Sequence, residues 1–314
     1  MAEIKLFYHK DGVVRLSRSL DFLKSNPIES FLWIDLNDVD EEVENELEDF
    51  LKIYIQEEEE MIEIEMSSRY IETQDTLVVN SNFLLSNFES DPVSFILKNN
   101  ILVTVRSEEL ISFHETVKKI SANPKGYNTG ADVLVALLET RVEFDADLIE
   151  TMTHKITQLS NSLSLQEADK ELLGEIKNLQ EKTMMLRENI IDKQRTVSSM
   201  LRSDFIPKEL QPKLSMIIRD INSLVEHIKF SFDRLDYLQD TFLGYVNIEQ
   251  NNIIKIFTIV SVIFMPPTLI ASIYGMNFTR MPELDMRWGY PVSLGLMVLS
   301  SLAILLYFKK KKWL

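Results

Sequence analysis

The stretch from Ile256 to Ile273 is IFTIVSVIFMPPTLIASI, 18 residues without a charged side chain. A second uncharged stretch of 19 residues, YPVSLGLMVLSSLAILLYF, runs from Tyr290 to Phe308. At about 1.5 Å per helical residue, each stretch approaches the ~30 Å thickness of a bilayer's hydrocarbon core. Two core helices of a large soluble domain are the alternative, but such helices rarely run this far without a charge. The sequence therefore predicts two membrane-spanning helices, over residues 253–273 and 290–308.

The charges beside these stretches predict how the chain is oriented. Four lysines, Lys309–Lys312, follow the second stretch, and Trp313 stands next to them. Basic residues accumulate on the cytoplasmic side, so we expect the tail 309–314 inside and the loop 274–289 outside. Residues 1–30 lack the apolar core of a signal peptide, so residues 1–252 are expected in the cytosol. These features predict a multi-pass protein in the lipid bilayer of the cell (inner) membrane, with both termini cytoplasmic.

The charge balance and the missing residue types exclude several classes of function. The 314 residues carry 33 Lys and Arg against 49 Asp and Glu, and residues 1–254 alone have a net charge of −21. Nucleic-acid binding needs a basic face, so no nucleic-acid partner is expected. There is no cysteine, the four histidines lie far apart, and no glycine-rich phosphate loop is present. We predict no enzyme, no catalytic residue and no organic cofactor, but a protein that handles or senses cations.

The part of the chain before the first span has two kinds of sequence pattern. Residues 1–125 alternate strand-like and helix-like runs, which predicts an α/β domain. The predicted helices are Asp40–Lys52 and Glu108–Ile120. Residues 93–97 and 101–105 are expected to pair as a hairpin. The predicted strands are Ile4–Tyr8, Phe31–Leu36, Met61–Met66, Thr76–Leu85, Val93–Leu97 and Ile101–Val105.

After the Asn123–Gly126 break the chain becomes almost wholly helical. Residues 126–210 should hold two long antiparallel helices, Asp132–Ser162 and Gln166–Arg202. Between Pro212 and Pro266 the only helix-breaking residue is Gly244. A stalk helix over 211–252 should therefore continue into the first span. The predicted fold class is an α+β membrane protein: a cytosolic α/β domain, a long helical stalk and two C-terminal transmembrane helices.

A stripe of mostly small or polar side chains runs along this last helix. Alternating steps of four and three residues, the period of a supercoiled helix, place its members on one side. The stripe either packs against another helix, as small residues do, or lines a pore, because polar side chains avoid lipid. A pore with one such stripe per chain requires a cyclic homo-oligomer. The members are Asp240, Gly244, Asn247, Asn251, Ile254, Thr258, Ser261, Met265, Thr268 and Ser272.

The end of the first span carries a more specific pattern. Phe264-Met265-Pro266, Tyr274–Phe278, Met281-Pro282-Glu283-Leu284 and the ending Lys309–Leu314 resemble the CorA magnesium/cobalt transporters. The hallmark of that family is Gly-Met-Asn closing the first of two spans. The resemblance implies a funnel-shaped homopentamer with five copies of the first span around a pore. It also implies uptake of Mg²⁺, and of Co²⁺ or Ni²⁺, driven by the membrane potential and gated by intracellular Mg²⁺.

The resemblance also implies roles for individual residues. Gly275, Met276 and Asn277 would form the selective pore entrance, where an amide oxygen can bind the waters of hydrated Mg²⁺ without removing them. Glu283 would be the acid of the extracellular loop. The pore-lining residues would be Asp240, Asn247, Asn251, Thr258, Ser261 and Thr268, and the hydrophobic gate would be Ile254, Phe257 and Met265.

The family further implies regulatory Mg²⁺ sites between neighbouring cytosolic domains. Glu60, Glu143 and Asp220 are the candidates, although a solvated acidic face explains each of them equally well. Two other functions stay open: a proton-coupled zinc transporter similar to ZntB, and a non-conducting membrane-tethered coiled-coil scaffold or sensor. The loop sequence Met281–Leu284 favours the magnesium channel, and flux into sealed vesicles would exclude the scaffold.

Overall fold

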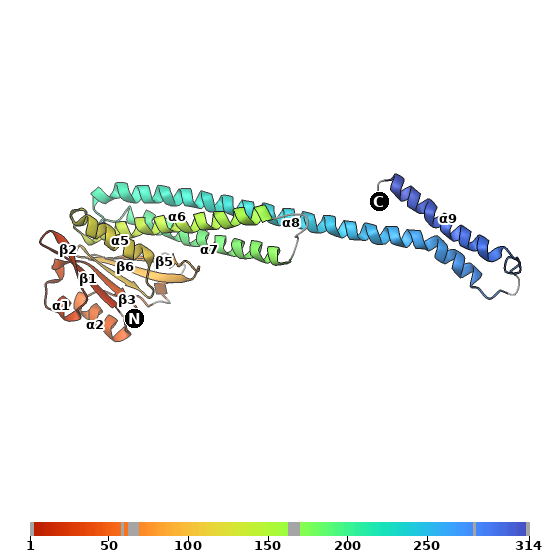
Figure 1. Ribbon diagram of the computed structural model, residues 1–314. Coiled ribbons are helices and arrows are strands. Elements are labelled where there is room, and N and C mark those ends of the chain that lie inside the picture. The colour runs from red at the N-terminus through yellow and green to blue at the C-terminus, as the bar shows by residue number, and fades with distance from the viewer. Residues whose placement is uncertain (1–2, 58–59, 62–68, 163–169, 279–280, 312–314) are drawn as a thin grey trace. The chain divides into compact units, whose positions relative to one another are not determined.

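The computed structural model describes residues 3–57, 60–61, 69–162, 170–278 and 281–311 (Figure 1). The chain divides into two compact units, whose boundary in the last long helix lies between Leu238 and Gln239. The first unit holds a sheet and long helices, and the second holds a pair of apolar helices. Each unit is described by itself.

A seven-stranded mixed sheet forms the centre of the first unit. Its strand order is β2-β1-β3-β7-β6-β5-β4, and the β3–β7 pair is parallel while the others are antiparallel. The strands are β1 (Glu3–Lys10), β2 (Val13–Ser17), β3 (Phe31–Asn37), β4 (Tyr70–Glu72), β5 (Thr76–Leu84), β6 (Ser90–Lys98) and β7 (Ile101–Arg106).

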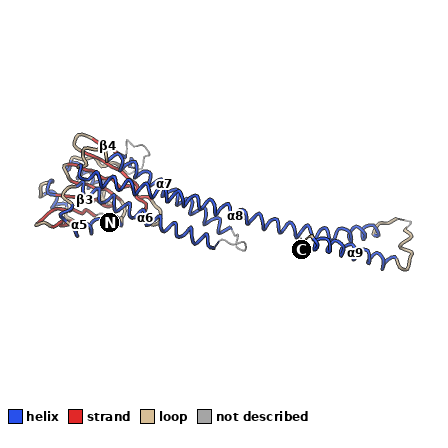
Figure 2. Tube along the Cα trace, turned by 90° about the horizontal axis from the view of Figure 1, so that it is seen from above, coloured by secondary structure: helices blue, strands red, loops and turns tan. Residues whose placement is uncertain are grey.

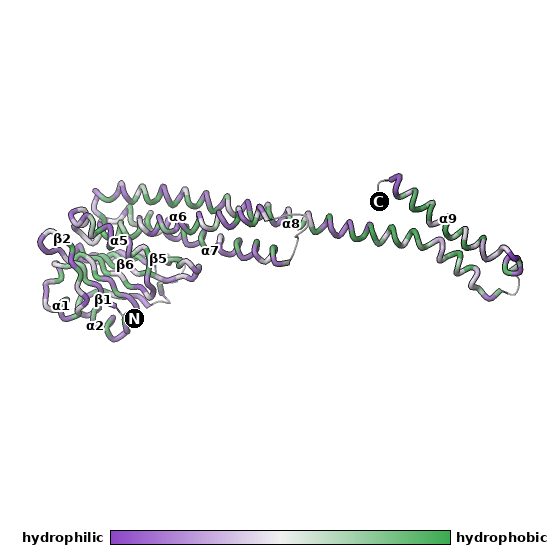
Figure 3. Tube along the Cα trace, viewed as in Figure 1, coloured by the Kyte–Doolittle hydropathy of each residue, from purple (hydrophilic) through white to green (hydrophobic). Residues whose placement is uncertain are grey.

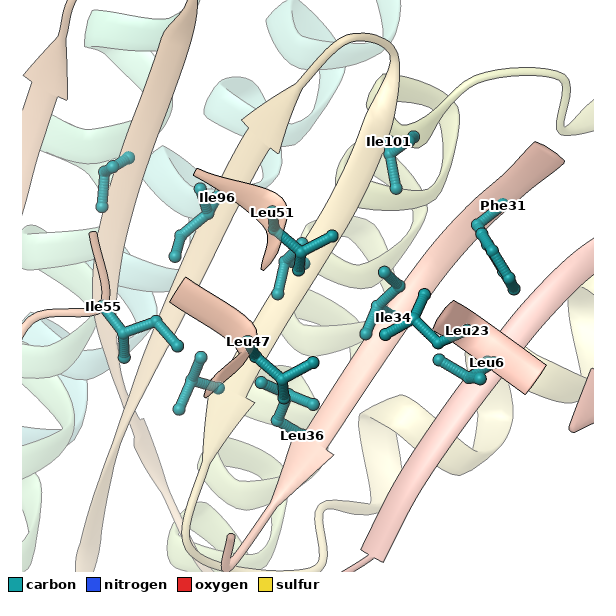
Figure 4. Close-up of a cluster of buried hydrophobic side chains, with 13 residues drawn as sticks. Leu6, Leu23, Phe31, Ile34, Leu36, Leu47, Leu51, Ile55, Ile96 and Ile101 are labelled. Atoms are coloured by element: carbon teal, nitrogen blue, oxygen red, sulfur yellow. The ribbon is translucent and has the colours of Figure 1, made fainter. Parts of the chain in front are cut away.

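Helices cover both faces of this sheet, so its central strands are buried on both sides. The short helices α1 (Leu20–Lys24) and α2 (Glu41–Leu51) cover one face, where aliphatic side chains form a core (Figure 4). The helices α5 (Ile111–Ala122), α6 (Gly130–Ser162) and α7 (Lys170–Met200) cover the other. Every residue of β3 and β7 is buried, which explains why their sequences, FLWIDLN and ILVTVR, begin with consecutive apolar residues rather than an alternating pattern.

Aromatic rings fill the interface between the sheet and α5. Phe7 stacks on Trp33 with 4.5 Å between ring centroids, and Phe113 of α5 lies 5.8 Å from Trp33. These strand residues have the opposite parity to the aliphatic core residues, as the alternation of strand side chains requires. The rings bury large apolar areas and therefore contribute much of the free energy that holds α5 on the sheet.

Most of the predicted elements of this unit are confirmed. Strands stand at five of the six predicted positions, and the sixth, Met61–Met66, lies almost wholly outside the described residues. The predicted hairpin is β6–β7, and positive φ angles at Asn99 and Asn100 form its two-residue turn. The predicted start of α5 at Glu108 was wrong. The Glu108 carbonyl accepts a hydrogen bond from Arg106, and Leu110 is still extended, so the helix begins at Ile111.

Three short elements had no counterpart in the prediction: β2, α1 and β4. The turn into β2 has positive φ at Asp11 and Gly12. Asp-Gly is the dipeptide that favours such a turn, so a signal for β2 was present. Strand β4 is only three residues long, too short for its Tyr and Ile to form a recognisable strand pattern.

The long helices pack along one another within the first unit (Figures 1 and 2). Helix α8 (Gln211–Tyr274) follows the short 3₁₀ turn Lys208–Leu210 and places a buried seam against α6 and α7. Arg234 donates to the Thr157 hydroxyl of α6 at 2.9 Å, and Gln180 of α7 donates to Asp236 at 2.9 Å. The buried seam has the three- and four-residue spacing of a helix packing face: Leu214, Ile217, Ile221, Ile228, Leu235 and Leu238.

A buried ionic cluster joins α6, α7 and β5. Arg141 donates to the Asp145 carboxylate at 2.5 Å and to the Leu84 carbonyl oxygen at 2.9 Å. The ammonium group of Lys193 lies 3.0 Å from the other oxygen of Asp145, and all three side chains are at most 2% exposed. Burial lowers the pKa of Lys193 to about 8, although Asp145 beside it favours the charged form. One carboxylate therefore balances two cations in a dry interior.

The second unit consists of the C-terminal part of α8, a loop, and α9 (Gly289–Lys310). Both helices contain a window that is apolar and long enough to cross a membrane, and hydrophobic residues predominate there in Figure 3. Only 6% of the window in α8 and 11% of that in α9 are buried within the chain. Core helices of a soluble protein would be covered, so these windows favour the predicted spans.

The ionic cluster generates a stability prediction. Asp145→Asn leaves Arg141 and Lys193 buried without a counter-charge, which should lower the free energy of unfolding of the first unit by about 3–5 kcal/mol. Urea unfolding of the detergent-solubilised protein measures this change, followed by the fluorescence of the buried Trp33 in a background where Trp288 and Trp313 are replaced by Phe. The control is Glu181→Gln, which breaks the exposed Lys177–Glu181 pair and should cost less than about 1 kcal/mol. Equal midpoints for both variants would contradict the prediction.

Candidate ion pathway along α8

Helix α9 covers one particular face of α8. The Ser301 hydroxyl of α9 donates to the backbone carbonyl of Ile263 at 3.2 Å. Ile259 lies one turn earlier on the same face of α8 and is 6% exposed. The aliphatic side of α8 therefore packs against α9 of the same chain.

The hydrogen bond from Ser301 has a local cause. Pro266 and Pro267 lie inside α8, and a proline has no N–H to donate to the carbonyl four residues earlier. Pro267 therefore leaves the backbone carbonyl of Ile263 without its helical hydrogen bond. The Ser301 hydroxyl donates to this carbonyl instead. An unpaired carbonyl is costly in lipid, so the second proline is accommodated by a side chain of α9.

The predicted polar stripe lies on a side of α8 that α9 leaves uncovered. Met265 is 64% and Ile254 is 54% exposed, although both are apolar. An open groove follows the stripe near the end of the helix, lined by Ser261, Phe264, Met265, Thr268, Leu269 and Ser272. Of the predicted stripe, Gly244 is half-buried, and the exposed members are Asp240, Asn247, Asn251, Ile254, Thr258, Ser261, Met265, Thr268 and Ser272.

Two hydroxyls on the stripe are already oriented by the backbone. Thr258 donates to the Ile254 carbonyl at 2.8 Å, and Thr268 donates to the Phe264 carbonyl at 2.7 Å. Each hydroxyl group thereby donates its proton within the helix, while its oxygen can still accept a hydrogen bond. The waters around a cation direct their hydrogens outward, so these oxygens match a hydrated ion better than a bare anion.

The predicted gate residues are not all equivalent. Ile254 and Met265 belong to the stripe, whereas Phe257 comes one position before Thr258 and lies beside it. Phe257 is nevertheless 69% exposed, so its ring is free of contacts that would bury it within its own chain. Ile254 and Phe257 lie within one turn of each other on α8, and Met265 lies about two turns beyond Phe257.

The same spacing continues towards the start of α8, which the sequence analysis did not recognise. Steps of seven residues back from Gly244 reach Tyr237, Phe230, Ser223 and Met216, all of them exposed, and the three large side chains Tyr237, Phe230 and Met216 are 68%, 64% and 52% exposed. They lie opposite the buried seam of the first unit. A heptad search begun upstream of Asp240 would have found them.

The predicted entrance follows directly on α8. The Gly275 amide donates to the Ala271 carbonyl at 2.9 Å and the Met276 amide donates to Ile273 at 3.2 Å, so the last turn extends through the motif. Asn277 lies beyond these hydrogen-bonded residues and is exposed. It follows the last helical residue, Tyr274, by three positions, which is too far for a C-terminal cap.

The predicted loop acid lies in a compact turn. The Leu284 amide donates to the Met281 carbonyl at 3.1 Å, and Glu283 between them is exposed. The start of α9 follows within six residues. The structure therefore presents the Glu283 carboxylate to solvent at the end of the span pair that also carries Asn277.

The three regulatory candidates are not brought together within one chain. Glu143 pairs with Lys119 at 2.8 Å, and Glu60 accepts a hydrogen bond from the Tyr54 hydroxyl at 2.9 Å. Asp220 is exposed on α8. Among the described residues no group of three or more His, Cys, Asp or Glu is arranged to hold a metal ion. A regulatory site built from these acids would need a second copy of the chain.

Comparisons with known proteins identify the family. The family model of the CorA-like Mg²⁺ transporter protein matches residues 29–310. The magnesium transport protein CorA of Wolinella succinogenes is 39% identical over 320 residues, covering 99% of this chain and 100% of that protein. The complete CorA magnesium transporter structure from Methanocaldococcus jannaschii has a TM-score of 0.83 at 22% identity, covering 100% of this chain and 99% of that one.

A more distant structural neighbour is the ZntB cytoplasmic domain of Vibrio parahaemolyticus, with a TM-score of 0.58 at 12% identity. It covers 78% of this chain and 98% of its own, and at this identity it shows a shared fold alone. The family model, in contrast, covers both apolar helices and most of the first unit. The chain belongs to the CorA-like Mg²⁺ transporter family, which is a family of transporters and not of enzymes.

Proposed function

We propose that this protein is a homopentameric channel of the cell (inner) membrane that takes up Mg²⁺, and also Co²⁺ and Ni²⁺. Both termini are cytoplasmic. The observation that carries the proposal is the stripe on α8 between Asp240 and Ser272, which its own chain leaves uncovered and which leads to Asn277. The name of the Wolinella succinogenes relative supports Mg²⁺ as the ion. Transport needs no organic cofactor and no nucleic-acid partner.

Several copies of the chain must surround the pathway. One stripe per chain can enclose a pore only if the copies are arranged around an axis. Exposed Phe230 and Tyr237 in the first unit support this arrangement, because their spacing matches the stripe and association would bury them. The resemblance to the CorA family supports five copies.

The entrance chemistry suits a small divalent ion that keeps its water. Mg²⁺ gives up water reluctantly, so the first contact should be with its hydration shell. The Asn277 carbonyl accepts hydrogen bonds from that shell without the strong binding that a ring of carboxylates would produce. Glu283 in the adjacent turn raises the local cation concentration. A potential of ~100 mV supplies about 4.6 kcal/mol to a divalent ion, so uptake needs no ATP.

An apolar collar closes the pathway. Ile254 and Met265 on the stripe, with Phe257 beside the first of them, are large and uncovered. Around an axis such side chains form rings that exclude water, and a dewetted ring blocks ions without a tight steric seal.

Intracellular Mg²⁺ regulates the collar. The strongly acidic first units of neighbouring copies repel one another unless cations lie between them, and Glu60, Glu143 and Asp220 are the acids assigned to that role. Bound Mg²⁺ stabilises the compact, closed arrangement. When internal Mg²⁺ falls, the ions leave and the open state gains population.

Flux into proteoliposomes tests the function. The purified protein should admit Mg²⁺, detected by an internal dye, in proportion to an imposed membrane potential, and Co²⁺ and Ni²⁺ should compete. Uptake of Zn²⁺ that follows a pH gradient instead would indicate a carrier similar to ZntB. The absence of any flux would indicate a scaffold or sensor.

Asn277→Ala should abolish Mg²⁺ uptake while leaving a folded, membrane-inserted oligomer, because it removes only the first-contact amide. Dye uptake and size-exclusion chromatography measure the two properties. The matched control is Asn252→Ala, an exposed asparagine next to the stripe, which should transport as the parent does. Mg²⁺ uptake by Asn277→Ala at the parental rate would contradict the assignment of Asn277 to the pore entrance.

Single cysteines should report which face of α8 meets other subunits, and the chain has no native cysteine to interfere. Cysteines replacing Met265 or Thr268 should form crosslinks between subunits on mild oxidation. Those replacing Ile263 or Val260 should not, because Ile263 is on the face that α9 covers and Val260 is not on the stripe. Non-reducing electrophoresis distinguishes these results, and the reverse pattern would place the axis on the wrong side.

Protease protection of the first unit should rise with Mg²⁺ at constant ionic strength and fall again when EDTA removes the ion. Neutralising Glu60, Glu143 or Asp220 should weaken the response, whereas Glu181→Gln should not. A response of equal size to NaCl at matched ionic strength would mean general screening, and the regulatory sites would be withdrawn.

A further inference from the structure

Gly289, the first residue of α9, is in unusually close contact with the loop before it. A Cβ atom placed on Gly289 would lie 2.1 Å from the carbonyl oxygen of Glu283 and 3.2 Å from its carbonyl carbon. Real Cβ atoms essentially never approach another heavy atom within 3.0 Å. The turn can therefore fold back onto α9 only where the helix has no side chain.

Two further hydrogen bonds belong to this contact. The Gly289 amide donates to the Met286 carbonyl at 2.9 Å, and the Leu284 amide donates to the Met281 carbonyl at 3.1 Å. Side chains contribute little to holding the loop. Leu284, Met286 and Trp288 are 59%, 63% and 73% exposed. The backbone contact at Gly289 is thus a tight constraint on where the turn can lie.

The other glycine of α9 provides a contrast. A Cβ atom on Gly295 would have no neighbour within 4 Å, so its missing side chain serves no contact within the chain. The close approach at Gly289 is a property of its position and not of glycine in this helix.

We propose that Gly289 is a positioning residue for ion capture, because it fixes the backbone of Glu283 and thereby the place of that carboxylate at the entrance. The inference rests on the proposed uptake of a divalent cation. A carboxylate attracts an approaching ion most strongly when it is held near the path, since the interaction falls with distance and with screening by salt. A side chain at position 289 displaces the turn and moves the carboxylate.

This role affects capture more than passage. Glu283 attracts the ion before it enters the pore. Displacing its carboxylate should therefore lower the rate of uptake mainly when external Mg²⁺ is scarce. At saturating Mg²⁺ the entrance is occupied in any case, and the rate is set further along α8. A defect in folding or assembly would instead lower the maximal rate and leave the concentration dependence unchanged.

The test is a double-mutant cycle on the full-length protein in proteoliposomes, with Mg²⁺ alone as the transported ion. Uptake is measured against external Mg²⁺ for the parent, Gly289→Ala, Glu283→Gln, the double variant and Gly295→Ala. Gly289→Ala and Glu283→Gln should each raise the half-saturating Mg²⁺ concentration several-fold with little change in maximal rate. The double variant should be no worse than Glu283→Gln alone, because a displaced glutamine has no charge to lose. Gly295→Ala should match the parent.

Three results would overturn the proposal: an unchanged half-saturating concentration in Gly289→Ala, a lowered maximal rate without such a shift, or effects that add in the double variant. Hydrogen exchange on the parental protein keeps the test independent of how well Gly289→Ala folds. The amides of Leu284 and Gly289 should exchange more slowly than free peptide, and exchange at the free-peptide rate would refute the held turn.

A separate measurement distinguishes failure of this inference from failure of the proposed function. In a background with Asp285→Cys, the rate of labelling by a membrane-impermeant maleimide reports the turn without any transport. Gly289→Ala should change that rate several-fold and Gly295→Ala should not. If the parent admits no Mg²⁺, the proposed function fails while this labelling still decides whether Gly289 holds the turn. Equal labelling in both variants would overturn the positioning role.

Discussion

An uncharged polar side chain within the hydrocarbon of a bilayer must meet water or another polar group. In this protein that constraint falls on one helix. α9 takes the aliphatic face of α8, at Ile259 and Ile263, and the polar stripe is left without a partner in the chain. A single copy in lipid would expose Ser261 and Ser272 to hydrocarbon. The proposed assembly around an axis would remove this conflict, and it would also create the aqueous path that an ion needs.

The first unit depends on a different balance. Its sheet is buried on both faces, so the acidic residues that make the chain anionic have been displaced to the surfaces of the helices. Some of the charges that lie inside are paired, as Asp145 is with Arg141 and Lys193. Asp91 is also buried, and desolvation raises its pKa to about 6. The exterior carries an excess of carboxylates that mobile cations can offset. The proposed regulation by intracellular Mg²⁺ depends on this excess of negative charge.

The sequence predicted the features that depend on long-range periodicity. Two uncharged stretches, a 3.5-residue stripe and runs of β-branched residues specify spans, a seam and buried strands, because each repeats a physical requirement many times. The short elements carry less information. Strand β4 is held by its pairing with β5 and not by its three residues, and the start of α5 depends on a contact from Arg106.

The finer features of the candidate site could not be predicted for a related reason. The glycine at position 289 is an ordinary helix-start residue until the backbone of Glu283 is placed against it, and the Ser301 hydroxyl looks like any small polar group in a span. Both are contacts between segments that only the folded chain brings together. The placement of Asn277 at the pore entrance, in contrast, rests on a local motif at the end of a helix, and it stays a prediction.

The bond between Ser301 and the Ile263 carbonyl has a consequence for the order of assembly. It joins two helices of the same chain, so it can form once both are inserted, before any second copy arrives. Helices inserted separately in a bilayer otherwise have little beyond packing to set their register. Here the Ile263 carbonyl, which Pro267 leaves without a helical hydrogen bond, favours the register of α8 and α9 in which the Ser301 hydroxyl donates to it. Each subunit would then join the oligomer as a hairpin already aligned, with the polar stripe as the face still to be buried.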